Sequence, residues 1–166
     1  MKKLTALLLA GMMVASLAAC GEKKNEDPSV DSFTSASVAD FYGDYGLTGD
    51  DLMNALNSFQ GSYLLATVNP DGSPNIGFYI YGCVKHNDTY YLQLGLADNQ
   101  SKQNLERTGQ GMAAYAAAPD PEKGFSMAGA RMTFTVVTDE ALIAELKGDS
   151  THESIYGQIT EIRSLG

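Results

Sequence analysis

The feature that most constrains the fold is a series of short strand-like segments separated by turn residues. Residues 63–68 and 75–84 are rich in β-branched and aromatic side chains, and Asp71-Gly72 between them is a strong hairpin signal. A third such segment, residues 90–96, follows a polar turn at 86–88. Together they predict three consecutive antiparallel strands.

The rest of the chain adds further strands and helices. Three more segments have strand-like sequences: residues 112–117, 131–137 and 155–162. Thr48 can cap a helix whose apolar residues recur at i, i+3, i+4 and i+7, and residues 99–110 and 139–147 have helical composition. About six strands and three short helices predict a mainly β domain, either a small antiparallel barrel or a sandwich.

The N-terminal segment has the layout of a secretory signal. Lys2 and Lys3 precede an apolar run over residues 4–14, which is shorter than the roughly 20 residues needed to cross a bilayer. Leu17-Ala18-Ala19-Cys20 then resembles the lipobox of bacterial lipoproteins, which implies cleavage before Cys20 and lipid on its sulfur. An ordinary signal with a chance cysteine is the alternative. We therefore expect an exported chain, lipid-anchored at the cell surface or the periplasmic face.

The sequence divides into three predicted parts: a signal peptide at 1–19, a lipidated cysteine with a flexible tether at 20–47, and a folded domain at 48–166. The chain has 11 basic and 20 acidic residues, a net charge of -9, so it has no electrostatic attraction to nucleic acid or anionic lipid. Membrane association would depend on the lipid anchor only. Cys83 is the one other cysteine, so no internal disulfide is expected.

Three segments in order carry a resemblance to a known family. They are residues 66–74 (ATVNPDGSP), 90–94 (YYLQL) and 99–105 (NQSKQNL). Their order and spacing resemble the pyridoxamine 5′-phosphate oxidase-like proteins, the FMN-binding split-barrel family, over about residues 50–163. The resemblance implies a six-stranded antiparallel split β-barrel, FMN as cofactor, and a homodimer with the flavin at the subunit boundary.

The resemblance also implies where FMN would bind. Asn99, Ser101 and Lys102 supply donors and a cation at the start of a helix, where free N–H groups favour an anion, and the family places the phosphate there. The flavin ring would lie along the second strand, at Gly77, Phe78, Tyr79 and Ile80. Gly77 would let the ring approach the backbone closely. Arg131 or Arg107 could complete the site from either chain.

Other uses of these residues stay open. Ser101 can be a helix cap, Lys102 a solvated surface charge, and the aromatic residues of the second strand can pack within the sheet. Asp98 would repel a phosphate unless it points away or takes part in capping. Asp98 therefore favours a protein in which FMN binding is weakened or lost.

The remaining chemistry-bearing residues form no recognisable site. Residues 124–128 (GFSMA) imitate a nucleophile elbow but end in alanine and do not follow a strand. His86 and His152 are isolated in sequence, and no cluster has metal-ligand spacing, so no metal site is predicted. Cys83 lies within an apolar strand, where a buried packing role is expected.

Two functions follow from this sequence. The first is an FMN-binding redox protein, an FMN-dependent oxidoreductase that exchanges electrons with a small molecule, with no catalytic residue assigned. The second is a non-catalytic module of the same fold that binds haem, another planar ligand or a protein partner.

Overall fold

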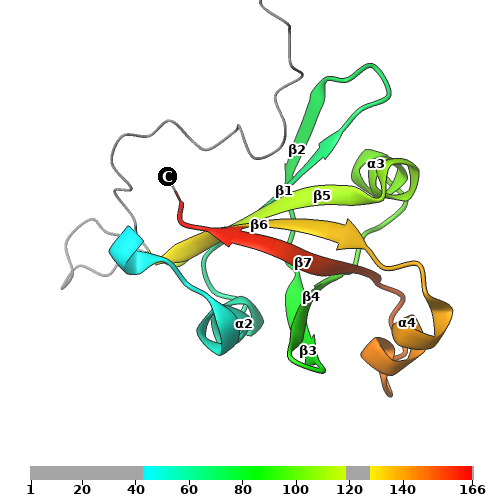
Figure 1. The fold of residues 1–166 in the computed structure, drawn as a ribbon. Coiled ribbons are helices and arrows are strands. Elements are labelled where there is room, and N and C mark those ends of the chain that lie inside the picture. The colour runs from blue at the N-terminus through cyan, green and yellow to red at the C-terminus, as the bar shows by residue number, and fades with distance from the viewer. Residues whose placement is uncertain (1–42, 119–127, 166) are drawn as a thin grey trace, which may run out of the picture. The chain divides into compact units, whose positions relative to one another are not determined.

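The computed structural model describes residues 43–118 and 128–165. Within them, seven strands form one antiparallel sheet in the order β2-β1-β5-β6-β7-β4-β3 (Figure 1). The strands are β1 (Ser62–Val68), β2 (Pro74–Phe78), β3 (Gly82–His86), β4 (Thr89–Leu94), β5 (Gln110–Ala116), β6 (Gly129–Val136) and β7 (Ile155–Arg163). The predicted mainly β fold is confirmed, with seven strands in place of six.

The additional strand arises because the segment predicted as one strand is two. β2 and β3 are separated by Tyr79–Tyr81, and they lie at opposite edges of the sheet. Tyr81 is buried, and its hydroxyl donates to the carbonyl oxygen of Ala114 at 2.7 Å and to that of Leu64 at 3.3 Å. The chain therefore turns inward at Tyr81 and stops pairing with β1.

This short link forces the sheet to curl. The chain from Phe78 to Gly82 can span at most about 14 Å. In a flat sheet of this width, the two edge strands would lie about 29 Å apart. The sheet must therefore bend until β2 and β3 approach each other at the link, although no ladder joins them. A curled sheet that remains open in this way is a split barrel.

Three α-helices in the described residues accompany the sheet: α2 (Gly49–Asn57), α3 (Gln100–Thr108) and α4 (Glu140–Lys147). The ends of α3 and α4 follow their sequences. Asn99 and Asp139 cap the first turns with their side chains, and Gly109 ends α3 with a φ of 68°. Thr48 stands at the start of α2, but its side chain makes no capping bond.

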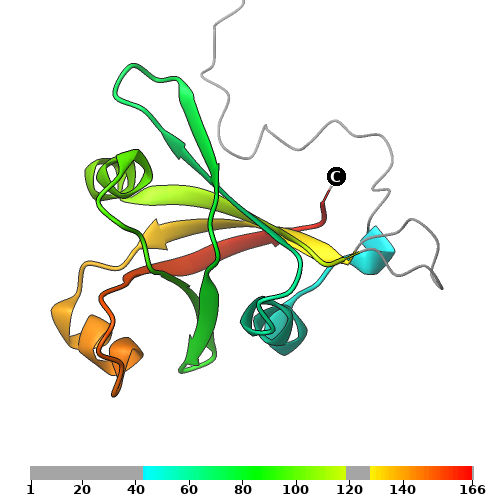
Figure 2. The same ribbon diagram turned by 180° about the vertical axis from the view of Figure 1, so that it is seen from behind.

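The core lies inside the curl. Leu65, Leu92, Met132 and Phe134 from three strands are buried there, together with Leu52 and Leu56 of α2 and Leu105 of α3. A second, smaller cluster joins Leu146 of α4 to Tyr91 and Tyr156 on the other side of the sheet. The helices therefore lie at separate places around the sheet (Figure 2).

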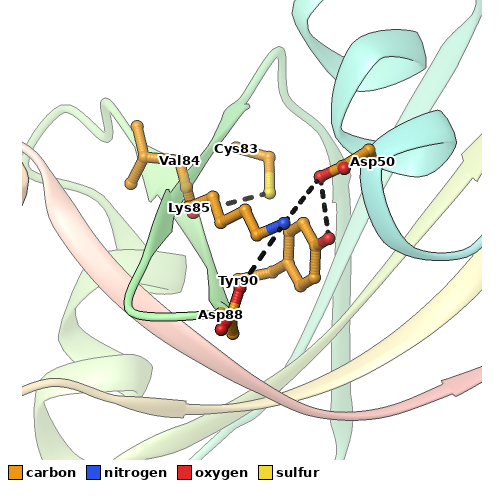
Figure 3. Close-up of polar contacts among 6 residues, drawn as sticks. All are labelled: Asp50, Cys83, Val84, Lys85, Asp88 and Tyr90. Carbon is orange, nitrogen blue, oxygen red and sulfur yellow. Dashed lines mark hydrogen bonds and ion pairs between the residues drawn. The ribbon is translucent and has the colours of Figure 1, made fainter.

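A polar cluster attaches α2 to the β3–β4 hairpin. Figure 3 shows Lys85 and Tyr90 of the hairpin pointing toward Asp50 of α2. The Asp50 carboxylate accepts from the Tyr90 hydroxyl at 2.8 Å and from Lys85 Nζ at 3.1 Å. The Lys85 ammonium also lies 5.2 Å from the centre of the Tyr90 ring. These contacts hold the start of α2 against the hairpin.

The segment before α2 contacts the sheet. Gly43–Tyr45 form a short 3-10 helix, η2, and the Leu47 N–H donates to the Gly129 carbonyl at 2.9 Å. The sequence assigned these residues to the tether, and the exact domain boundary stays a prediction. The signal peptide, Cys20 and the elbow-like residues 124–128 lie outside the described residues. No helix in the described part of the chain is long and apolar enough to span a membrane.

Candidate functional site

The outward face of β2, β1 and β5 carries exposed apolar side chains. Register pairs place Phe78 beside Leu64 and Ala114, and Ile76 beside Ala66 and Met112, while Leu65 and Ala113 between them face the core. Five apolar residues on and beside this face are substantially exposed: Val68, Ile76, Phe78, Ile80 and Met112. Phe78 is 78% exposed. A contiguous apolar surface of this kind commonly marks a binding site.

The backbone of β2 adds hydrogen-bonding groups to this surface. Tyr79 donates its N–H to the Tyr63 carbonyl, so alternate residues of β2 direct their N–H and C=O toward β1. Ile76 and Phe78 therefore direct theirs to the free edge of the sheet. The opposite edge is covered at Cys83, whose backbone makes two 2.8 Å bonds with the Asn57 side chain. In residues 43–118 and 128–165, no such cover protects the edge of β2.

A pocket opens at the end of this edge. It has a volume of about 220 Å³ and is lined by Gly61, Ser62, Tyr63, Phe78, Tyr79 and Ile80. Three of these residues were predicted from the sequence to lie against a flavin ring. Part of the predicted ring site therefore lines a pocket in the structure.

The start of α3 has the donors that the sequence suggested. Asn99 accepts from the Lys102 N–H at 3.1 Å as the cap of the helix. The amides of Gln100 and Ser101 are first-turn donors with no partner within the helix. The Lys102 ammonium lies at the surface, 3.9 Å from the Glu106 carboxylate. Asp98 is exposed to solvent.

The Ser101 side chain connects α3 to β2. Ser101 is 1% exposed, and its hydroxyl accepts from the Asn75 amide at 2.9 Å and lies 3.0 Å from the Tyr79 hydroxyl. The phosphate and ring sites predicted from the sequence are therefore neighbours, joined by one serine. Ser101 acts in this structure as a link between elements.

Two buried polar residues extend this link and were missed by sequence reasoning. Asn104 is fully buried, and its amide donates to Thr67 and to Asn69, both at 3.0 Å. Thr67 also accepts from the Asn75 amide at 3.1 Å. No sequence signal marked Asn104 as buried, since polar positions on a short helix are usually solvated. Thr67 lies on β1, at a buried position of that strand.

The space over Gly77 is filled by the protein itself. A Cβ atom at Gly77 would lie 2.6 Å from the Tyr79 ring, so the absent side chain makes room for Tyr79. Gly77 and Tyr79 share the inner side of β2, whereas Phe78 and Ile80 lie on the exposed side. The exposed half of the predicted ring site is therefore the half available to a ligand.

The two candidate arginines lie in different places. Arg107 of α3 donates to the Val68 carbonyl. Arg131 of β6 lies in the same register row as Ala114 and Leu64, on the outward face. Its Nε donates to the Ser164 carbonyl at 2.7 Å. The structure thus brings Arg131 to the apolar face but not to Lys102.

The remaining reactive groups do not join this site. Cys83 is buried in β3, and burial raises the pKa of its thiol to about 11. His86 ends β3, with Nε2 3.2 Å from the Glu145 carboxylate, and His152 is exposed before β7. The described residues contain no group of three His, Cys, Asp or Glu side chains that could hold a metal ion.

The fold and the open sheet face define a split β-barrel protein, and solved structures agree. A crystal structure of an FMN-binding protein from Syntrophomonas wolfei subsp. wolfei gives a TM-score of 0.52 at 16% identity, covering 70% of this chain and 85% of that one. HupZ from Group A Streptococcus gives 0.50 at 20% identity, covering 72% of this chain and 100% of that one. No family model and no curated protein matches the chain. These similarities show the fold, and the family assignment stays a prediction.

Proposed function

We propose that this chain is a membrane-anchored extracytoplasmic protein that binds FMN and exchanges electrons with a small molecule. The observation that carries the proposal is the uncovered edge of β2. It combines exposed apolar side chains, free backbone groups and a pocket, and Ser101 connects it to a helix N-terminus.

The chemistry of FMN fits these residues. Its flat apolar ring matches the exposed side chains of Phe78 and Ile80, and its polar pyrimidine edge matches the unpaired N–H and C=O groups of β2. Its phosphate matches the first-turn amides of α3 and the Lys102 ammonium. The bound flavin would supply the electron-transfer chemistry, while the chain would bind it, orient it and exclude water.

The size of the pocket supports a homodimer. A volume of about 220 Å³ is below the roughly 300–1,000 Å³ usual for a ligand site. One subunit would therefore cover only part of the flavin. A second copy placed against the same edge would enclose the rest of the flavin.

Three further observations support this proposal. The Syntrophomonas wolfei protein of the same fold is an FMN-binding protein. A haem of the rival function would call for an axial ligand. No histidine lines the pocket, and the hydroxyls of its two tyrosines, Tyr63 and Tyr79, are already bonded to the Leu56 carbonyl and to the Ser101 hydroxyl. The lipobox-like sequence before Cys20 supports the membrane location.

The test is the visible spectrum of the purified mature chain. Residues 20–166 carrying Cys20→Ser should retain FMN or take up added FMN, with flavin absorption that dithionite bleaches. A colourless protein that binds no added FMN would contradict the proposal and favour the non-catalytic module.

A substitution tests where the phosphate binds. Lys102→Ala should weaken FMN affinity about tenfold, because a charge-assisted hydrogen bond to the phosphate is lost at a partly exposed position. Isothermal titration with FMN measures this change. Lys147→Ala, which removes a positive charge from α4, is the matched control and should leave the affinity unchanged. Equal affinities for all three proteins would remove Lys102 from the site.

A further inference from the structure

We propose that the outward face of β1, β5 and β6 binds the small-molecule substrate as an aromatic organic anion, with Arg131 holding its acid group. This inference rests on the proposed function in one respect, because it places the substrate beside the flavin site on β2. The binding itself depends only on residues of this chain.

The first observation is a pair of arginines side by side. Arg131 of β6 and Arg163 of β7 are register partners, so their side chains leave the same face of the sheet. Directly opposed residues have Cβ atoms about 4.5–5.5 Å apart, and like charges in such a pair are unfavourable. The Glu161 carboxylate offsets part of that repulsion at Arg163, and an anion bound by Arg131 would offset the rest.

The second observation is how the two charges are partnered. Arg163 is paired with Glu161 at 2.6 Å. Arg131 is fixed by the bond from its Nε to the Ser164 carbonyl, which is a neutral acceptor. Among the residues that the structure describes, no ion pair involves Arg131. Its planar guanidinium is therefore held in place by a neutral acceptor with no carboxylate from the described residues bonded to it, which suits a carboxylate, sulfonate or phosphate.

The third observation is the apolar surface that continues from Arg131. The same register row contains Ala114, Leu64 and Phe78, in that order. Three strand spacings, about 14 Å, separate Arg131 from Phe78, and the pocket lies at the Phe78 end. A ligand for this row needs an acid group at one end and a flat apolar body beyond it.

Charge complementarity selects an organic anion over a membrane surface. The whole chain carries a net charge of -9, which repels an anionic bilayer and disfavours unspecific binding of anions. A local arginine can still attract one small anion at close range. The ring of such a ligand would pack along the alanine and leucine of the row.

The test compares two probes that share one ring system. Anilinonaphthalene sulfonate is an aromatic anion, and phenylnaphthylamine is its neutral analogue; both fluoresce on binding. The flavin-free mature chain with Cys20→Ser should bind the anion at least tenfold more tightly than the neutral probe. Arg131→Gln should remove this preference: the affinity for the anion should fall about tenfold, and the affinity for the neutral probe should change little. Arg131→Lys keeps the charge but loses the planar guanidinium, so its affinity for the anion should lie between those of the wild type and Arg131→Gln.

The controls separate this inference from the proposed function. Lys147→Gln removes one positive charge, as Arg131→Gln does, but on α4, and it should keep the preference for the anion. Equal affinities for the two probes, or an unchanged preference in Arg131→Gln, would overturn the inference. An anion affinity that weakens as protein concentration rises would show that a second copy covers this face, and would also overturn it. Since no flavin is present, failure to bind FMN has no effect on this result.

Discussion

Individual polar side chains inside the barrel were the least predictable part of this chain. The sequence placed Ser101 at the start of a helix, and the structure agrees. Its bonds to Asn75 and Tyr79 reach residues 26 and 22 positions away in the chain, which no local pattern records. Asn104 is a similar case, because its position on a polar helix suggested solvent while packing against β1 buries it completely.

Gly77 gives a residue-scale prediction. Gly77→Ala should lower the free energy of unfolding by about 1–3 kcal/mol, because the new methyl group would lie 2.6 Å from the Tyr79 ring. Urea unfolding followed by circular dichroism measures the change. Gly95→Ala is the control, since no atom lies within 4 Å of a Cβ there.

A second substitution checks the cause. If the clash with Tyr79 is responsible, Gly77→Ala should cost much less in a Tyr79→Ala background, where the ring is absent. The same cost in both backgrounds would mean that the Tyr79 ring is not the obstacle.

Helices and hairpins were largely predictable because their signals are local. Asp71-Gly72 gave the β1–β2 turn, and Asp139 gave the start of α4. The break between β2 and β3 was not predictable, since the strand-like composition of residues 75–84 continues through it. Only the burial of Tyr81 and its bonds to two other strands define that break.

The docking of α2 gives an element-scale prediction. The Tyr90 hydroxyl, followed by Lys85, lowers the pKa of Asp50 from its ordinary value of 3.8. A lowered pKa in the folded state means that the charged carboxylate stabilises the fold above pH 3.8, and that this stabilisation is lost as the pH falls through the folded-state pKa. Asp50→Asn should therefore be less stable than the wild type at neutral pH, and the difference should shrink in acid.

Urea unfolding at neutral pH and below pH 3.8 measures this effect. Asp51→Asn is the matched control, because Asp51 is the exposed neighbour on the same helix. A stability difference between wild type and Asp50→Asn that stays constant over this pH range would exclude the ionised carboxylate as its source.

The order of strands belongs to the whole molecule. The sequence supported a barrel or a sandwich, and the family resemblance selected the split barrel that the structure contains. Adjacent strands in the chain, β2 and β3, end at opposite edges because β1 pairs with β5 and β4 pairs with β7. Such long-range pairings arise from the packing of the complete core, so no single segment encodes them.

Tyr81 gives a prediction at the scale of the whole molecule. It lies in the short link between edge strands β2 and β3, and its hydroxyl bonds that link to β1 and β5. Tyr81→Phe should lower the free energy of unfolding by about 1 kcal/mol through loss of the 2.7 Å bond to the Ala114 carbonyl. Thermal and urea unfolding measure it. Tyr156→Phe, which loses only a 3.4 Å bond from Gln93, should cost less. An equal loss of unfolding free energy in the two variants would mean that the bond to Ala114 stabilises the fold no more than the longer bond does.

The two borders of the sheet differ in a way that affects how the chain survives in solution. Asn57 occupies the backbone groups of Cys83 on β3, whereas no described residue occupies the outward N–H groups of Ile76 and Phe78 on β2. An unguarded border of this kind is a template on which strands of other polypeptides can stack, leading to aggregation. Whatever molecule occupies β2 would also act as a solubiliser, and the ligand-free chain should be the first to precipitate.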